Sequence, residues 1–438
     1  MPEQQNVEWK ESWRDEYMKW VSGFANAKGG SIFIGKSDNG TITGISNYKK
    51  LMEDLPNKIS SKLGVLCDVN LHEKGALHYI EIVTRPYNIA ISFNGKYYRR
   101  SGSTNQELKG SDLNEFLLKK SGRTWDDVIE PNATLEDIDE DSVKIFVADA
   151  ISNERLPEIG SKTDVPTILE NLRLLENGKL KRAALLLFGK DPKKFFVSAF
   201  IKIGMFGASD TDLKFQDALE GNLINLSVGA YLRLTTKFLK KHISYDGIKR
   251  LDTLEYPPDA LREALFNAMV HRVYEATPIQ ISVYDDKIIF WNQGTLPEQL
   301  TVQDLKAKHS SFPRNPLVAD IFFKAGLIEA WGRGTLKIIE ECSKAGLPEP
   351  KIEETTGGIS ITLFKDRTNE EYLKKLGLSD NQKEAVDYVK KNGSITNSKY
   401  QELFKVSDRT ALRHLDELTR LNILNKVGEK KGTVYHLN

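Results

Sequence analysis

The chain has 438 residues, of which 40% are hydrophobic and 28% are charged. This composition is typical of globular proteins and excludes a wholly disordered chain, and the length predicts about three domains. The formal net charge is only +1, so any nucleic-acid binding must come from local basic patches. No apolar run reaches the roughly 20 residues that a membrane helix needs, and Cys67 and Cys342 lack metal-ligand spacing. We therefore expect a cytoplasmic protein with reduced cysteines and no membrane partner.

The first segment, residues 1–125, has the pattern of an α+β domain. An amphipathic, helix-like stretch over residues 9–27 ends at a Gly-Gly turn, and the short apolar strand 31–35 follows it. An Asp-Asn-Gly hairpin signal at residues 38–40 comes next. Further strands are predicted over residues 41–45, 77–83 and 94–100.

Three motifs in this segment carry a family resemblance. They read FANAKGGSIFIG at residues 24–35, DNG at residues 38–40 and RRSGST at residues 99–104. Together they resemble the AlbA_2 domain of Schlafen-type proteins, which implies a domain that binds nucleic acid, either DNA or RNA. Adjacent arginines beside a Ser/Gly/Thr turn suit a phosphate, although a solvated basic face is the alternative. The candidate nucleic-acid contacts are Lys10, Lys28, Arg99 and Arg100.

The same resemblance suggests a metal-dependent nuclease as an alternative. In Schlafen nucleases, two glutamates five residues apart and a later aspartate hold a divalent metal for RNA cleavage. Glu3, Glu8 and Asp38 fall at the matching places, and three carboxylates would bind Mg²⁺ or Mn²⁺ and activate water. Against this, Glu3 lies almost at the start of the chain, and Asp38 also suits a turn with no further role.

Residues 126–250 form a connecting α+β region in this interpretation, and residues 251–368 a second module. A helix predicted over residues 259–274 places Glu263, Asn267 and His271 four apart, on one face. An Asn so placed would ligate Mg²⁺ that also touches phosphates, and a Glu one turn earlier would polarise water for ATP hydrolysis. The alternative is a solvated helix face.

These residues resemble the N-box of the GHKL ATPases, the family of gyrase, Hsp90, histidine kinases and MutL. Asn292 and Gly294 occupy the place of that family's adenine-binding box, with Asn292 where an Asp is usual. Gly332, Gly334 and Thr335 match the glycine-rich second box, whose backbone N–H groups hold phosphate. Residues 301–327 would be the ATP lid. Its candidate phosphate contacts are Ser310, Ser311, Arg314 and Asn315.

The last segment, residues 376–438, resembles a winged helix-turn-helix. Helices are predicted over residues 379–391, 398–405 and 408–421, and two short strands flank a lysine-rich loop. The third helix carries Ala411, Leu412, Leu415 and Leu418 as a predicted buried stripe. In such domains the third helix reads base edges and the wing meets phosphates. The candidate contacts are Arg409, Thr410, Arg413, Lys430 and Lys431.

The sequence therefore predicts a multidomain α+β protein that binds DNA and responds to ATP and Mg²⁺ as a transcriptional regulator. ATP would close the lid, change domain packing or dimerisation, and so alter DNA binding, with slow hydrolysis resetting the switch. A homodimer is expected, since two-fold operators match two-fold proteins. The alternatives are a Schlafen-type nuclease controlled by the ATP module, and a scaffold with degenerate sites. A winged helix used only for protein contacts also stays open.

Overall fold

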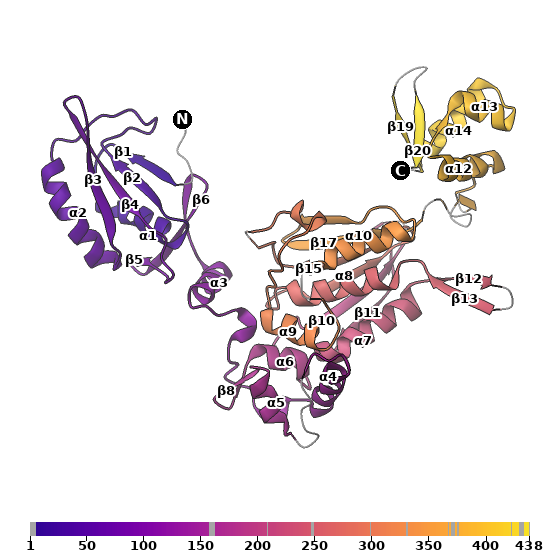
Figure 1. Ribbon diagram of the computed structural model, residues 1–438, viewed down its shortest axis with the longest axis horizontal. Helices are drawn as coiled ribbons and strands as arrows, with labels where there is room; N and C mark the ends of the chain where they lie inside the picture. The colour runs from indigo at the N-terminus through magenta and orange to yellow at the C-terminus, as the bar shows by residue number, and fades with distance from the viewer. Residues whose placement is uncertain are drawn as a thin grey trace. The chain divides into compact units, whose positions relative to one another are not determined.

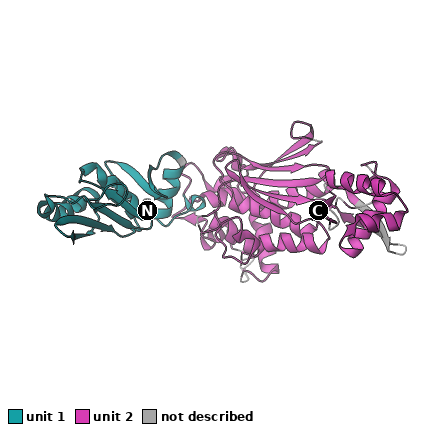
Figure 2. Cartoon of the chain, turned by 90° about the horizontal axis from the view of Figure 1, so that it is seen from above, with its two compact units in different colours: residues 1–128 teal, residues 129–438 magenta. Residues whose placement is uncertain are grey.

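A computed structural model describes residues 6–156, 163–207, 209–246, 249–297, 299–329, 332–366, 368, 373–374, 376–421, 423–428 and 433–437. The chain divides into two compact units, residues 1–128 and 129–438 (Figure 2). Within these described ranges, no helix is both long and apolar enough to cross a membrane.

Unit 1 is built on a four-stranded sheet with the strand order β1-β2-β4-β3. Strand β1 (Val7–Lys10) runs parallel to β2 (Gly30–Ile34), while β4 (Leu77–Thr84) pairs antiparallel with both β2 and β3 (Cys67–Lys74). Helices α1 (Met18–Asn26) and α2 (Tyr48–Leu63) cover one face of this sheet (Figure 1). The remaining elements are β5 (Ser92–Phe93), β6 (Lys96–Ser101), β7 (Thr104–Glu107) and α3 (Gly110–Lys120).

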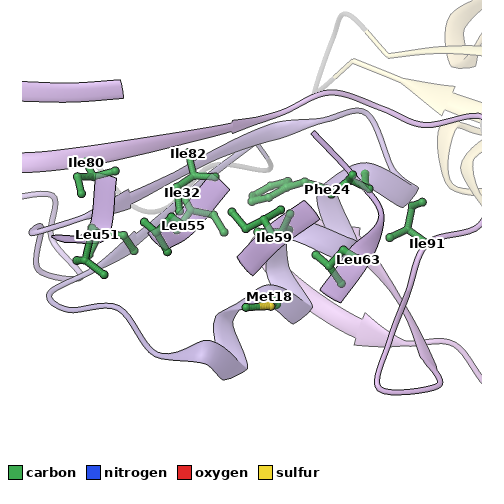
Figure 3. Close-up of a cluster of buried hydrophobic side chains, with 14 residues drawn as sticks. Met18, Phe24, Ile32, Leu51, Leu55, Ile59, Leu63, Ile80, Ile82 and Ile91 are labelled. Atoms are coloured by element: carbon green, nitrogen blue, oxygen red, sulfur yellow. The ribbon is translucent and has the colours of Figure 1, made fainter. Parts of the chain in front are cut away.

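The core of unit 1 lies between the two helices and the sheet. Every second residue of β2 and β4 faces it, as strand alternation requires, and leucines spaced four apart on α2 meet them. Figure 3 shows this packing of Ile32, Ile80 and Ile82 against Leu51, Leu55 and Ile59. The alternate residues of the same strands therefore face away from the helices.

The helix predicted over residues 9–27 is wrong at its start. Residues 7–10 form β1, and the α-helix begins only at Met18. Pairing with β2 supplies backbone partners for β1 that an isolated helical turn lacks, and it buries the Glu8 side chain against Arg100. Tertiary pairing therefore overrides the local pattern.

Unit 2 contains a six-stranded sheet with the order β11-β10-β14-β15-β17-β16. Its first two strands come from the region that the sequence assigned to a connector, so this region and the second module share one sheet. The pairings are antiparallel except for β10 with β14, which is parallel. The strands are β10 (Phe200–Phe206), β11 (Leu213–Glu220), β14 (Ile279–Val283), β15 (Lys287–Gln293), β16 (Lys351–Thr355) and β17 (Gly358–Phe364).

Helix α8 packs against β15 and helix α7 against β11, α10 lies beside α8, and the other helices of this region pack mainly on these helices and on one another (Figure 1). The helices are α4 (Glu140–Ser152), α5 (Val165–Asn171), α6 (Arg182–Phe188), α7 (Leu223–Arg233), α8 (Pro258–His271), α9 (Pro316–Lys324) and α10 (Gly334–Lys344). A π-helix, Leu234–Phe238, extends α7. Two hairpins complete the region, β8 (Leu175–Glu176) with β9 (Lys179–Leu180) and β12 (Lys241–Asp246) with β13 (Lys249–Leu254).

The C-terminal part of the chain has the predicted order of elements. Its helices are α12 (Asp380–Asn392), α13 (Asn397–Phe404) and α14 (Asp408–Arg420), and its strands are β18 (Ile395–Thr396), β19 (Leu424–Val427) and β20 (Val434–Leu437). Ala411, Leu415 and Leu418 are buried, but Leu412 is 40% exposed. The predicted stripe is wrong at Leu412 because that residue lies one position beyond the buried Ala411, about 100° around the helix.

Asn26 links α1 to the strands that follow the core of unit 1. Its amide donates to the carbonyls of Ile91 and Tyr98, both at 2.8 Å, and accepts from the Ile91 N–H. Asn26→Ala leaves these buried groups unpaired, so we expect the free energy of unfolding to fall by about 2–4 kcal/mol. Chemical denaturation of the whole chain measures this. The exposed Asn57→Ala is the control, and equal stability of the two variants would contradict the expectation.

Candidate nucleotide site and nucleic-acid surfaces

Helix α8 begins with Pro258 in its first turn, where a missing backbone N–H breaks no hydrogen bond of the helix. The negative charge of Asp259 interacts favourably with the positive end of the helix dipole. Apolar side chains on two of its sides are buried. Between them, Glu263, Asn267 and His271 follow one another at four-residue spacing, as predicted. The Glu263 side chain is almost fully enclosed, with 3% of the residue exposed.

The polar residues of α8 meet the first residue of α10. A Cβ atom added to Gly334 would lie 2.9 Å from Glu263 Oε2 and 3.1 Å from Asn267 Nδ2. Only a glycine permits this approach without displacing the two side chains. The structure therefore brings together Glu263, Asn267 and Gly334, three groups that the sequence separates by about 70 residues.

The electrostatics of this cluster suit a charged ligand. Burial raises the pKa of the Glu263 carboxyl, while nearby Lys337 and Arg262 oppose that rise. Asn267 Nδ2 is enclosed and has no hydrogen-bond partner within the described part of the chain. Burial, reinforced by Arg314 and His309, lowers the pKa of His271 to about 4. The imidazole is therefore neutral at pH 7, and the unpaired amide is a group that a ligand would satisfy.

The glycine-rich box is in contact with the predicted lid. Gly332 has a φ of +64°, and the carbonyl of His309 occupies the space where a Cβ would stand. His309 Nε2 also lies 3.4 Å from Thr335 Oγ1, in the first turn of α10. The exposed Ser310 and Ser311 lie beside this contact. Sequence reasoning missed His309, and its place next to the two predicted serines was the available signal.

The Asn315 side chain, a predicted phosphate contact of the lid, is already engaged in hydrogen bonds to α8. Its amide is buried and donates to the carbonyls of Val270 and Arg272, at 2.8 and 2.9 Å. These carbonyls end α8 and have no intrahelical partner, so Asn315 caps that end from a distance. The predicted phosphate contact is wrong for Asn315 in this structure, because both amide hydrogens are used.

The remaining predicted nucleotide contacts lie near the end of β15. Arg314 donates to the Thr295 carbonyl at 3.0 Å, and its Nε lies beside Gly294, which has a φ of +125°. Asn292 is buried and belongs to the same strand face as Phe290, the face that the helices cover. This face suits the adenine-binding role expected for Asn292.

In unit 1 the predicted catalytic Glu8 is part of a buried ion pair. Its carboxylate lies 2.7 Å from Arg100 Nη1 and 2.6 Å from Lys10 Nζ, and Arg100 also donates to the Val7 carbonyl. Arg100 is 3% exposed, so this guanidinium is not available to a surface phosphate. The predicted phosphate contact is therefore wrong for Arg100, because the parallel strand β1 delivers a carboxylate to it.

The other residues of the predicted phosphate patch and metal site are dispersed. Lys28 is exposed and Arg99 is half-buried, while Asp38 is exposed in the turn after β2. Glu3 lies outside the described residues. Over the ranges that the structure describes, no three His, Cys, Asp or Glu side chains are grouped as metal ligands. The nuclease alternative has no geometric support among these residues.

The predicted base readers lie on α14. Arg409 and Arg413 are exposed, whereas the Thr410 hydroxyl lies 3.0 Å from Ser407 Oγ, the N-cap of the helix. His414 accompanies them, with its Nδ1 2.9 Å from the buried Tyr400 hydroxyl. Lys430 and Lys431 lie outside the described residues.

Comparison with known families agrees with this geometry. Residues 3–109 match the family described as "Schlafen, AlbA_2", and residues 276–363 match the family described as "Putative ATP-dependent DNA helicase recG C-terminal". Two separate stretches of the chain thus match known domain families. The predicted AlbA_2 domain, the presence of a recG-type C-terminal module and the mixed α+β fold class are thereby confirmed. The recG C-terminal match includes the lid and both glycines of the second box but begins after α8 ends.

Whole-chain comparison adds little to the two domain matches. The crystal structure of the DIP2311 protein from Corynebacterium diphtheriae is similar at 17% identity, over 99% of this chain and 92% of that one, with a TM-score of 0.46. No curated protein matches the chain.

The approach of α8 to α10 predicts different effects for two Gly→Ala changes. Gly334→Ala adds a methyl group that displaces the ends of the Glu263 and Asn267 side chains, so we expect it to lose most or all of the roughly 1 kcal/mol that Ala otherwise adds to a helix. Gly229→Ala, in α7 with open space around it, should raise the free energy of unfolding by up to about 1 kcal/mol. Chemical denaturation compares them. A Gly334→Ala variant stabilised as much as Gly229→Ala would show that the two helices do not approach so closely.

Proposed function

We propose that the protein is a DNA-binding regulator whose nucleic-acid binding depends on a nucleotide held between α8 and the start of α10. The observation that carries this proposal is the convergence of Glu263 and Asn267 on Gly334, at the start of α10. Backbone N–H groups at a helix start favour phosphate, and glycines let a phosphate approach the backbone. The unpaired Asn267 amide is a polar group that such a ligand would satisfy.

The cluster offers a role for each residue toward ATP and a divalent ion such as Mg²⁺. The Asn267 carbonyl oxygen would ligate the ion, whose charge offsets that of the phosphates. Glu263 would orient a water molecule, since its raised pKa makes it a better base once ionised. Thr335 and the lid residues Ser310 and Arg314 would contact phosphate, and Asn292 would contact the base.

The contacts of the predicted lid, residues 301–327, support a mechanism by which nucleotide binding would change the conformation of the protein. Residues 309–311 rest on Gly332, and His309 reaches Thr335 in the same turn where phosphate is expected. A nucleotide would compete for that turn and so shift the lid. A ligand shifts the equilibrium between two conformations only if it contacts them differently. The nucleotide would do so, because residues 309–311 contact its expected position in one conformation and would leave it in the other.

The C-terminal elements support the DNA-binding half of the proposal. Three helices and a small antiparallel sheet follow one another in the order expected of a winged helix, which supports that interpretation, and Arg409 and Arg413 are exposed on the first two turns of α14. The description of the second matched family also mentions a DNA helicase, which agrees with DNA as the partner. We propose a homodimer that matches a two-fold operator.

Nucleotide control is tested by measuring duplex DNA affinity with and without an ATP analogue and Mg²⁺. We expect the analogue to change the affinity of the wild-type chain at least about fivefold, as allosteric coupling usually does, and Asn267→Ala to abolish that change. Asn57→Ala, on an exposed face of α2, serves as the control and should behave like the wild type. Equal DNA affinity with and without the analogue in the wild type would refute the nucleotide switch.

Base recognition by α14 is tested by measuring the affinity of Arg413→Ala for a selected duplex DNA target and for single-base variants of that target. Loss of one base contact should cost about 1–3 kcal/mol on the preferred target and relax the preference at a single position. The matched control is Arg420→Ala, at the exposed C-terminal end of the same helix, which should leave the preference intact. A uniform loss across all sequences would show that Arg413 contacts phosphate only.

A further inference from the structure

The four-stranded sheet of unit 1 has an aromatic row on the face that its helices do not cover. Ile32 and Ile34 of β2 and Ile80 and Ile82 of β4 point into the core, so their neighbours Phe33 and Tyr79 belong to the opposite face. Strand register adds two more rings to that face. Trp9 pairs with Phe33 across β1 and β2, and His72 pairs with Tyr79 across β3 and β4.

Three of the rings are neighbours across β2, β4 and β3. Phe33 and Tyr79 have ring centres 6.4 Å apart, and Tyr79 and His72 are stacked at 5.0 Å with 16° between their planes. All four residues are partly exposed, so part of their surface stays accessible. The turn after β2 borders the row, because Gly40 lies close against the Trp9 indole. We call Trp9, Phe33, Tyr79 and His72 the aromatic row.

A cation and several polar groups accompany the aromatic row. Lys36 Nζ lies 3.8 Å from the centre of the Phe33 ring and 4.7 Å from that of Tyr79. Glu81, which pairs with Phe33 in the register of β2 and β4, accepts from Ser31 Oγ at 2.9 Å and lies 3.0 Å from His72 Nε2, so its carboxylate is engaged within the sheet. The exposed Asn70 belongs to the same face.

We propose that this face binds single-stranded nucleic acid, with bases stacked on the aromatic row and Lys36 beside the phosphates. Each base has an apolar π face that stacks on an aromatic ring, whereas a duplex hides those faces. Asn70 and Ser31 supply hydrogen-bonding groups for base edges. The mixture of rings with a lysine and polar side chains suits a nucleotide chain better than an apolar protein surface.

This surface is distinct from the residues predicted for nucleic acid in unit 1. The engagement of Arg100 with Glu8 removes one predicted phosphate contact. The aromatic row lies on the sheet face opposite the core and uses side chains that composition alone would assign to a hydrophobic interior. The inference rests on the proposed nucleic-acid-binding function but concerns a different surface from α14.

The test measures binding of the full chain to labelled 12-nucleotide thymidine and uridine oligonucleotides by fluorescence anisotropy. We expect Tyr79→Ala to weaken this binding about 5- to 150-fold, as loss of a stacked base predicts, and Tyr79→Phe to stay within about twofold of the wild type. Lys36→Gln should lower the slope of log affinity against log salt by about 0.7. Phe33→Leu keeps a similar apolar volume but removes an aromatic ring. It therefore tests the effect of lost stacking on oligonucleotide affinity if Tyr79→Ala does not fold.

The outcomes separate this inference from the proposed function. Duplex affinity and its nucleotide dependence should be unchanged in Tyr79→Ala, because α14 is intact. Wild-type oligonucleotide affinity in folded Tyr79→Ala and Phe33→Leu would overturn the inference and leave the switch standing. A changed oligomeric state with unchanged oligonucleotide affinity would also overturn it and identify an interface between copies. Loss of nucleotide dependence in the wild type would refute the switch alone.

Discussion

The arrangement of the candidate nucleotide site depends on the contact between α8 and the first turn of α10. Gly334 permits a distance at which any other residue would push aside a carboxylate and an amide. The contact places a buried, ionisable Glu263 and an unpaired Asn267 amide at the positive end of a helix. Such groups carry a free-energy cost within a folded domain, so their presence points to a ligand that offsets it.

The other polar groups around this contact divide into those that hold the fold and those that remain available. Arg272 is buried and donates to the carbonyls of Ser198 and Thr277, at 2.9 and 2.8 Å, which ties the end of α8 to the sheet. Asn315 caps the same helix end. These two residues therefore fix the C-terminal end of α8, the helix that carries Glu263 and Asn267.

The AlbA_2 domain shows the same division between structural and available charge. Glu8 and Arg100 neutralise each other inside the sheet, where an unpaired charge would be costly. Lys36 instead lies over two partly accessible rings and keeps its charge at the surface of the aromatic row. If the aromatic row binds nucleic acid as proposed, a chain with a net charge of only +1 would do so through a local surface and not through general basicity.

The sequence by itself determined the two family resemblances, the mixed α+β class and the order of elements in the C-terminal segment. It also indicated that Glu263 and Asn267 share a helix face, because four-residue spacing is a local property. It did not determine that β1 is a strand, that Arg100 is internal or that Asn315 caps α8. Those outcomes depend on partners distant in the chain, and only tertiary packing decides which carboxylate or carbonyl reaches a given side chain. The same reason explains why the aromatic row was visible only once four strands were placed in register.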